Sequence, residues 1–181
     1  MGFVVAVDGP AGSGKGTITK KIAKEMNLTS IDTGAMYRSV TLAMLNKNIA
    51  LDDFEKISKL LDEIKIEFKK IDGVQKVYLN GKDVSLEIRT KHVNENVSPV
   101  STIKIVRERL AKLQREMAET IDVIMEGRDI GTYVFPNADV KIYLDATPEE
   151  RANRRYKQNQ ILGIDMPYEE ILENIKTRDK N

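Results

Sequence analysis

A glycine-rich stretch that directly follows an apolar run constrains this chain more than any other feature. Residues 3–7 are apolar and end at Asp8, and the pattern after residue 17 is that of an amphipathic helix. The loop between them consists of Gly9, Pro10, Ala11, Gly12, Ser13, Gly14, Lys15, Gly16 and Thr17. A G-x-x-x-x-G-K loop between a strand and a helix can wrap phosphate, because its backbone N–H groups converge at a helix N-terminus. We therefore call residues 9–17 the phosphate loop and predict that it binds a nucleoside triphosphate.

Three side chains of the phosphate loop are candidates for contacts with the triphosphate. Lys15 offers a mobile ammonium to the β- and γ-phosphates, and Thr17 or Ser13 offers a hydroxyl near Mg²⁺. Gly16 stands where most loops of this kind carry Ser or Thr, so we expect that hydroxyl from Thr17 instead. The alternative is a glycine-rich turn with a solvated lysine, which the flanking strand and helix patterns disfavour.

The strand–loop–helix pattern then repeats. Residues 28–32 form a short segment leading into Thr33, and the next helical pattern has an apolar face made of Met36, Val40, Ala43 and Met44. Strands that alternate with helices predict an α/β fold with a parallel sheet, helices on both faces and ligands beyond the carboxyl ends of the strands. Thr33 and Arg38 are therefore expected on the same edge as the phosphate loop.

The hydrophobic period changes in the middle of the chain. Asp52 is expected to begin a helix as a capping box with Glu55, whose apolar face would be Phe54, Ile57, Leu60, Leu61 and Ile64. Residues 64–86 alternate between apolar and charged, and Asp72-Gly73 and Asn80-Gly81 are typical of tight turns. We predict a small antiparallel nucleotide-binding insert there, able to move when substrate binds.

Residues 87–100 are polar, and Pro99 disfavours helix at Ser98, so this segment is predicted to be irregular. A long helix is expected from Ser101 or Thr102, with Ile103, Val106, Leu110, Leu113 and Met117 along one face. Core packing is the favoured use of this face over dimerisation, because a coiled coil usually needs more heptads.

Two further apolar segments end in acids. Residues 122–129 finish with Glu126, Gly127, Arg128 and Asp129, and residues 140–145 finish with Asp145. An acid at a strand end beside a phosphate loop is suited to a Mg²⁺-linked or basic role, and an arginine can clamp a transferring phosphoryl group. Glu126 and Asp129 are preferred to Asp145 for the metal-linked role. The alternative for Arg128 and Asp129 is a surface ion pair of little energetic value.

An arginine-rich helix is predicted after Thr147, which has the features of an N-cap before Pro148. Arg151, Arg154 and Arg155 lie on one face of it, as expected for a lid over the ATP phosphates at about residues 147–166. A solvated basic face, with Glu150 paired to Arg154, is the alternative. A last amphipathic helix would carry Tyr168, Ile171, Leu172 and Ile175.

The composition excludes several classes of function. The chain has 181 residues, and its 29 Lys and Arg nearly balance 28 Asp and Glu, so neither a nucleic-acid polymer nor a membrane is an expected partner. The absence of cysteine removes disulfides and a thiolate nucleophile, and it fits a cytoplasmic protein. We expect a monomer with a single domain, whose core comprises residues 1–63 and 87–181.

Several motifs together resemble the bacterial cytidylate kinases. They are the phosphate loop, D-T-G-A-M-Y-R at residues 32–38, E-I-R-T at 87–90, E-G-R-D-I-G-T at 126–132 and E-R-A-N-R-R at 150–155. The resemblance covers essentially the whole chain. It implies a P-loop nucleoside monophosphate kinase fold and the transfer of the γ-phosphoryl group of ATP, with Mg²⁺, to CMP or dCMP.

The resemblance also implies roles for individual residues. Residues 9–17 would bind the ATP phosphates, and Lys15, Arg128 and Asp129 would be catalytic. Lys15, Arg38 and Arg128 would contact the phosphate of CMP. Ser98, Arg107 and Asp129 would contact the cytosine, and Thr33 and Arg178 would contact the sugar. Family members continue past the R-D-x-x motif with an acid, an arginine, a further core strand and a helix. The fold expected for residues 1–181 lacks this last strand and helix.

Other readings remain open. A regulatory GTPase would also carry a phosphate loop, but no N-K-x-D motif for reading guanine is present. An inactive nucleotide-binding form would bind ATP without making ADP when CMP is added. A kinase for another small acceptor, such as AMP or shikimate, is the nearest alternative.

Overall fold

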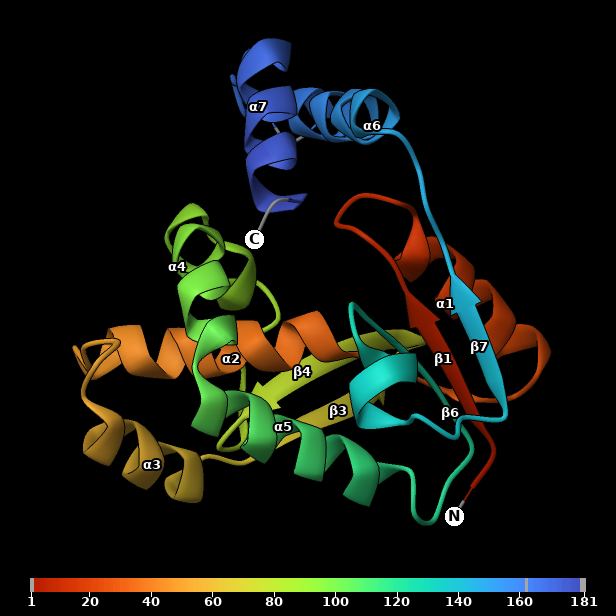
Figure 1. The fold of residues 1–181 in the computed structure, drawn as a ribbon, viewed down its shortest axis with the longest axis vertical. Helices are drawn as coiled ribbons and strands as arrows, with labels where there is room; N and C mark the ends of the chain where they lie inside the picture. The colour runs from red at the N-terminus through yellow and green to blue at the C-terminus, as the bar shows by residue number, and fades with distance from the viewer. Residues whose placement is uncertain (1, 162, 180–181) are drawn as a thin grey trace. The chain divides into compact units, whose positions relative to one another are not determined.

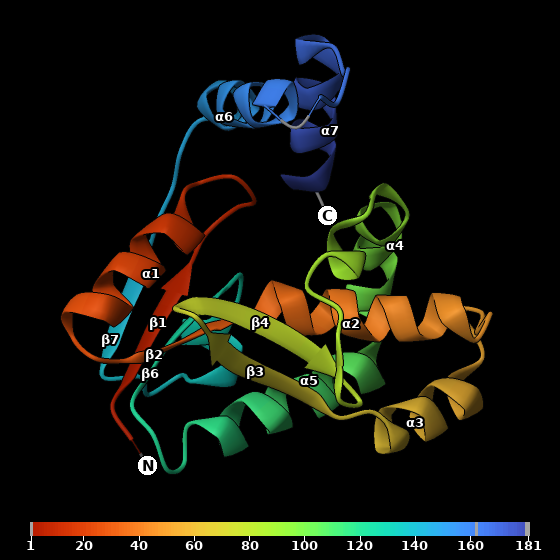
Figure 2. The same ribbon diagram turned by 180° about the vertical axis from the view of Figure 1, so that it is seen from behind.

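The computed structural model describes residues 2–161 and 163–179, which form two compact units. The phosphate-loop unit comprises Phe3–Ser30 and Asp122–Asn181, and the helical unit comprises Ile31–Ile121 with the N-terminal end. Figure 1 shows the elements of both units along the chain, and Figure 2 shows them from behind. No helix within the described residues is long and apolar enough to cross a membrane.

A parallel sheet organises the phosphate-loop unit. Its strands are β1 (Val4–Asp8), β6 (Val123–Gly127) and β7 (Val140–Tyr143), together with β2 (Thr29–Asp32), whose last two residues belong to the helical unit; the order in the sheet is β2-β6-β1-β7. β1 pairs in parallel with β6 on one side, where Val4 faces Val123, and with β7 on the other. The predicted α/β fold with a parallel sheet is therefore confirmed.

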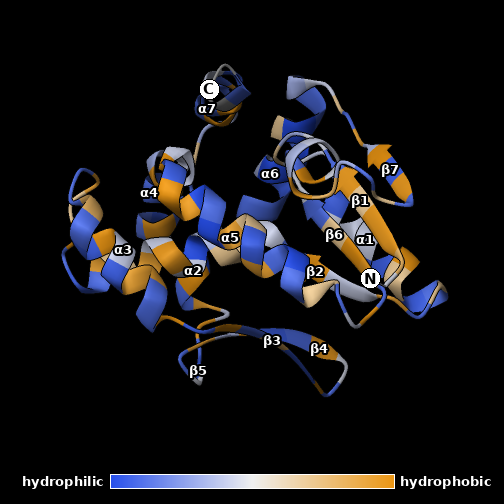
Figure 3. Cartoon of the chain, turned by 60° about the horizontal axis from the view of Figure 1, so that its bottom comes forward, coloured by the Kyte–Doolittle hydropathy of each residue, from blue (hydrophilic) through white to orange (hydrophobic). Residues whose placement is uncertain are grey.

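Burial explains why residues 4–8 form the central strand. Every residue of β1 is buried, as is usual for parallel strands covered on both faces, and Figure 3 shows the hydrophobic character of this strand. The helix α1 (Lys15–Glu25) packs on β1 and β6. Val5, Val7 and Ile124 meet Ala23 of α1 in one apolar cluster.

The C-terminal part of the phosphate-loop unit consists of α6 (Pro148–Ile161) and α7 (Tyr168–Asp179), which contact each other (Figure 1). The backbone N–H of Glu150 donates to Thr147 Oγ1 at 3.2 Å, so the predicted N-cap is confirmed. The rings of Tyr156 and Tyr168 pack edge to face with centroids 6.3 Å apart, which joins the two helices.

The helical unit contains α2 (Thr33–Asn46), α3 (Phe54–Glu63), the short 3₁₀ helix η1 (Glu87–Arg89), α4 (Lys91–Thr102) and α5 (Lys104–Met117). The apolar face predicted for α2 is confirmed, because its four predicted residues are buried. Two details of α3 differ from prediction. Asp53 rather than Asp52 is the N-cap, accepting the Lys56 N–H at 3.1 Å. Phe54, the first residue of α3, is 59% exposed, so the buried face begins only at Ile57.

The antiparallel sheet predicted within residues 64–86 is confirmed, whereas its nucleotide-binding role stays a prediction. It consists of β3 (Ile66–Ile71), β4 (Val74–Leu79) and β5 (Lys82–Asp83), in that order in the sheet. Figure 3 shows hydrophilic and hydrophobic residues interspersed along β3 and β4. Asp72 and Gly73 have φ of 50° and 78°, and Asn80 and Gly81 have 49° and 80°. Two successive positive φ values are typical of the type I′ turns that match the twist of a hairpin.

The prediction of an irregular segment at residues 87–100 is wrong. α4 runs through it and includes Pro99, which lies in the last turn. Proline removes one backbone hydrogen bond near the helix end, while burial of Val93 and Val100 stabilises the helix against α2 and α5. α5 consequently begins at Lys104, after the break at Ile103, and not at Ser101 or Thr102.

Candidate functional site

The backbone of the phosphate loop depends on glycine at two positions. Gly9 has φ of 148°, and a Cβ there would stand 2.0 Å from the backbone oxygen of Leu144. Gly14 has φ of 97° and is the N-cap of α1. No other residue fits the first position, and the second favours glycine because its φ is left-handed. The loop therefore leads from the end of β1 into the N-terminus of α1, as a phosphate site requires.

Two side chains of the loop provide polar groups for a phosphate. Lys15 Nζ donates to the backbone oxygens of Gly9 at 2.7 Å and Pro10 at 2.8 Å, so its ammonium lies over the loop. The hydroxyl of Ser13 is buried and has no hydrogen-bond partner among the described residues. A buried hydroxyl without a partner is costly, so an incoming phosphate oxygen would satisfy it.

Glu126 lies beside the start of α1. A Cβ added at Gly16 would stand 3.2 Å from Glu126 Oε1, closer than most side chains approach one another. The glycine that departs from the usual Ser or Thr therefore leaves room for this carboxylate. Thr17, the predicted source of the hydroxyl, is exposed in the first turn of α1. A carboxylate oxygen beside this turn is the kind of ligand that Mg²⁺ prefers.

The other two candidate acids lie elsewhere on the same edge. Asp145 is exposed after β7, and its Oδ1 accepts the backbone N–H of Ala146 at 2.8 Å. Asp129 is half-buried directly after β6, next to the exposed Arg128. Within the described residues, no group of three or more His, Cys, Asp or Glu side chains is placed to hold a metal ion.

Asp8 makes a contact near the candidate site that sequence reasoning missed. Its carboxylate accepts the backbone N–H groups of Ile130 and Gly131, each at 2.8 Å. These two residues begin the short π-helical turn η2 (Ile130–Val134), which follows Arg128 and Asp129. The available signal was an acid at the end of an apolar strand, the same signal that singled out Glu126.

Arg151 is the most buried of the three predicted lid arginines, at 3% exposure. It forms an ion pair with Asp179 of α7, with a 3.0 Å bond from one terminal nitrogen to Asp179 Oδ1. This hydrogen bond raises the pKa of the Arg151 guanidinium. Arg151 also donates to the backbone oxygens of Ala146 at 2.9 Å and Ala11 at 3.3 Å, so it joins α7 to the phosphate loop.

Arg154 and Arg155 have different surroundings. Arg154 donates to the backbone oxygen of Ser13 at 3.0 Å and to Glu150 Oε1 at 2.8 Å, so the ion pair considered as an alternative is present alongside a phosphate-loop contact. Arg155 is exposed and donates to Gln158 at 3.4 Å. The structure thus brings two of the three arginines to the phosphate loop.

A pocket of about 420 Å³ opens next to the phosphate loop. It collects residues from the loop, the strand ends and the lid: Gly9, Pro10, Arg128, Tyr143, Asp145, Ala146, Pro148, Arg151 and Asp179. Its two arginines are accompanied by the carboxylates of Asp145 and Asp179, and it lies beyond the carboxyl ends of β1 and β7, where open α/β sheets bind ligands.

In the helical unit, Asp32 organises the start of α2. Its Oδ1 accepts the N–H of Ala35 at 2.9 Å as an N-cap, and its Oδ2 pairs with Arg38 at 3.0 Å and Arg89 at 3.8 Å. Arg38 Nε is buried without a hydrogen-bond partner among the described residues. A Cβ at Gly34 would stand 3.1 Å from Arg38, so glycine permits this close packing. The guanidinium is thereby fixed over a helix N-terminus.

Three of the remaining acceptor-side candidates lie on neighbouring helices of the helical unit. Thr33 is buried at the first position of α2, and Ser98 and Arg107 are half-buried on α4 and α5. α2 contacts both of these helices, so one unit carries all three residues with Arg38. The side chain of Arg178 lies outside the described residues.

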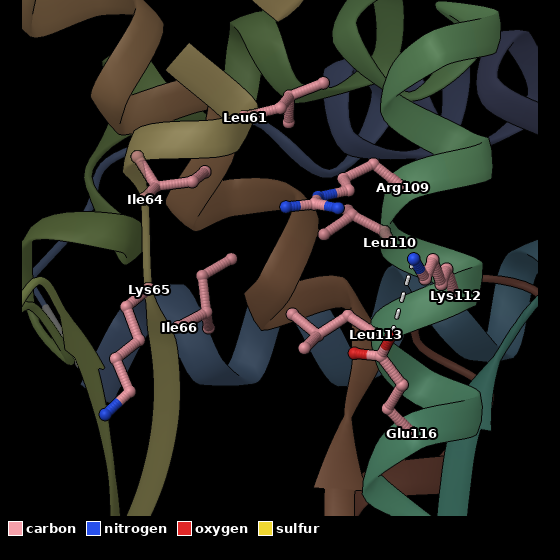
Figure 4. Close-up of a pocket in the computed structure, with 9 residues that line it drawn as sticks. All are labelled: Leu61, Ile64, Lys65, Ile66, Arg109, Leu110, Lys112, Leu113 and Glu116. Carbon is pink, nitrogen blue, oxygen red and sulfur yellow. Dashed lines mark ion pairs between the residues drawn. The ribbon is translucent and has the colours of Figure 1, made fainter. Parts of the chain in front are cut away.

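A second pocket, of about 330 Å³, lies within the helical unit and holds none of the predicted site residues. Figure 4 shows the apolar side chains of Leu61, Ile66 and Leu113 facing it from α3, β3 and α5. Its cations already have acidic partners, with Lys112 paired to Glu116 and Arg109 paired to Asp62.

Comparisons with known proteins agree on one family. The profile that describes the cytidylate kinases matches residues 5–181. A cytidylate kinase of Fusobacterium nucleatum is 53% identical over 177 residues, which are 98% of this chain and 79% of the relative. Cytidylate kinases of Caldicellulosiruptor bescii and Lactobacillus johnsonii are each 50% identical, over 98% and 97% of this chain and 78% and 76% of the relatives. This chain therefore belongs to the cytidylate kinase family.

Proposed function

We propose that this chain is a cytidylate kinase that transfers the γ-phosphoryl group of ATP to CMP or dCMP, giving ADP and CDP or dCDP. Membership of the family over residues 5–181 is the observation that carries the proposal. The phosphate loop supports it, because Lys15 Nζ and the buried Ser13 hydroxyl provide the polar groups that a triphosphate needs.

On the donor side, the phosphate loop binds the ATP phosphates, and Lys15 follows the β- and γ-phosphates. Lys15 exchanges its bonds to the Gly9 and Pro10 carbonyls for bonds to phosphate oxygens when ATP binds. Arg154, which already contacts the Ser13 carbonyl, and Arg151 stabilise the negative charge of the phosphates, and Arg155 joins them.

Magnesium enters with ATP, and the residues around Gly16 fit it. Glu126 beside the first turn of α1 is the favoured acid, with Thr17 or Ser13 as the hydroxyl. When bound, Mg²⁺ neutralises charge on the phosphate oxygens. We prefer Glu126 to Asp129 and Asp145, since its carboxylate lies against Gly16 at the start of α1.

On the acceptor side, Arg38 and Arg128 bind the phosphate of CMP together with Lys15. Ser98, Arg107 and Asp129 recognise the cytosine, and Thr33 and Arg178 contact the sugar. Cytosine and uracil exchange donor and acceptor at two positions, so an acid with an arginine and a hydroxyl can discriminate between them. No protein nucleophile is needed, because phosphoryl transfer of this kind depends on positioning and charge stabilisation.

The test is a turnover assay with Mg²⁺-ATP across CMP, dCMP, UMP, AMP and shikimate, following ADP formation. We expect CMP or dCMP to give the highest kcat/KM. Faster turnover of AMP or shikimate would assign a different acceptor, and ATP binding without ADP formation would make the chain an inactive nucleotide-binding form. We further propose that the enzyme acts in the cytoplasm and that it is a monomer. Sedimentation with and without nucleotides tests the oligomeric state.

A further inference from the structure

We infer that Asp8 is a positioning residue for the acceptor side of the reaction, because it holds the turn that carries Arg128 and Asp129. The inference rests on the proposed function, in which Arg128 binds the acceptor phosphate and Asp129 recognises cytosine. Asp8 is the last residue of β1 and directly precedes the phosphate loop. It is 8% exposed, so its carboxylate interacts with protein groups rather than with bulk water.

Both carboxylate oxygens of Asp8 are used at the same turn. Oδ1 accepts the N–H of Ile130 and Oδ2 accepts the N–H of Gly131, each at 2.8 Å. Hydrogen bonds to an ionised acceptor are roughly twice as strong as bonds between neutral groups. The first N–H groups of a helical turn have no partner within the turn, so the carboxylate supplies what η2 lacks.

The backbone of Asp8 is itself fixed by the sheet. Asp8 lies opposite Gly127 in the pairing of β1 with β6, and its carbonyl accepts the N–H of Leu144 at 2.8 Å. Arg128 and Asp129 are the two residues between Gly127 and Ile130. The two residues that flank the pair are therefore both neighbours of Asp8, Gly127 through the register of β1 with β6 and Ile130 through its bond to the Asp8 carboxylate.

The backbone of Asp129 bonds to the turn that follows it. The carbonyl of Asp129 accepts the N–H of Tyr133 at 2.8 Å and of Val134 at 3.2 Å. A Cβ at Gly131 would meet the Lys141 side chain at 3.3 Å and Asp8 Oδ2 at 3.4 Å, so the turn packs closely on Asp8. Loss of the carboxylate would let this turn shift, and a misplacement of about 1 Å can cost about 100-fold in rate.

The test compares Asp8→Asn with the matched control Asp139→Asn. Asp139 Oδ2 accepts the N–H of Val4 at 2.8 Å, which is the same kind of bond at the opposite end of β1.

We expect Asp8→Asn to lower kcat/KM for CMP by about tenfold or more, to narrow the preference for CMP over UMP and to leave the KM for ATP within about twofold. The control should change none of these. An Asp8→Asn enzyme that keeps its CMP preference and its KM for CMP would overturn the inference, even if it unfolds at a lower temperature.

Amide hydrogen exchange gives a readout that does not need activity. Exchange at Ile130 and Gly131 should accelerate in Asp8→Asn and stay unchanged in Asp139→Asn. If exchange accelerates in Asp8→Asn but the protein never phosphorylates CMP, the proposed function is rejected while the role of Asp8 in fixing the turn is supported. If exchange does not change, that role of Asp8 is rejected. If Asp8→Asn does not fold, Gly131→Ala places a Cβ 3.3 Å from the Lys141 side chain and 3.4 Å from Asp8 Oδ2. Accelerated exchange at Ile130 together with a normal preference for CMP in that variant would contradict the inference.

Discussion

The carboxylate of Glu126 lies so close to Gly16 that a Cβ on residue 16 would stand 3.2 Å from Glu126 Oε1. Glycine at residue 16 thus lacks the hydroxyl that most phosphate loops carry at this position, and it leaves room for the Glu126 carboxylate. The two residues are 110 positions apart in the sequence, and they meet because β6 lies beside β1 and α1 packs on β6.

Gly16→Ser restores the usual residue of a phosphate loop, and we nevertheless expect it to lower kcat by about tenfold or more, because the new side chain pushes Glu126 away. Shortening the acid with Glu126→Asp in the same chain should recover part of the loss. A double-mutant cycle in kcat at saturating Mg²⁺-ATP measures this coupling. Strictly additive effects would mean that the contact between the two residues is not the cause.

Lys15→Met removes the ammonium that bonds to the Gly9 and Pro10 carbonyls. We expect turnover to fall by about 100-fold or more, since the ammonium acts on charge that develops in the transition state. The free energy of unfolding should change little. Lys20→Met is the matched control, because Lys20 lies on the same helix and is exposed. Full turnover in Lys15→Met would remove Lys15 from the catalytic assignments.

Asp179→Asn removes the charged partner of Arg151, whose side chain is 3% exposed. We expect a loss of about 1–3 kcal/mol in the free energy of unfolding, since a buried guanidinium is left without its carboxylate. Glu150→Gln breaks the exposed pair with Arg154 and should cost about 0.5 kcal/mol or less. Urea denaturation compares the two variants with the unchanged chain. Equal losses in the two variants would show that burial of Arg151 does not strengthen its ion pair.

Local patterns made much of this fold predictable from sequence. The apolar run at β1 and the glycine loop after it identify the strand and helix of the phosphate loop, and Asp72-Gly73 and Asn80-Gly81 identify the turns of the insert. Each depends on neighbours in the chain, because backbone conformation and side-chain period are short-range properties.

The features that sequence could not provide depend on distant contacts. Pro99 was expected to prevent a helix, but burial of Val93 and Val100 outweighs the lost hydrogen bond. The bonds from the turn after β6 to Asp8 span more than a hundred residues, as does the contact of Arg154 with the Ser13 carbonyl. Residue type gave these side chains a plausible role, and only the three-dimensional fold identified their partners.

Asp53 gives the helical unit a pH-dependent contribution to stability. A side-chain hydrogen bond from Lys56, at 2.6 Å to Oδ2, and the Lys56 backbone N–H lower the pKa of the Asp53 carboxyl from its ordinary value of 3.8. Because the pKa is lower in the folded chain, the contribution of Asp53 to stability is complete above the unfolded pKa and is lost as the pH falls through the folded pKa.

Asp53→Asn keeps an acceptor for the cap and removes the charge. We therefore expect Asp53→Asn to unfold at a lower urea concentration than the unchanged chain at about pH 7, with the difference shrinking as the pH falls below 3.8. Urea midpoints across this range measure it, and a difference that stays constant with pH would show that the ionised carboxyl does not stabilise α3.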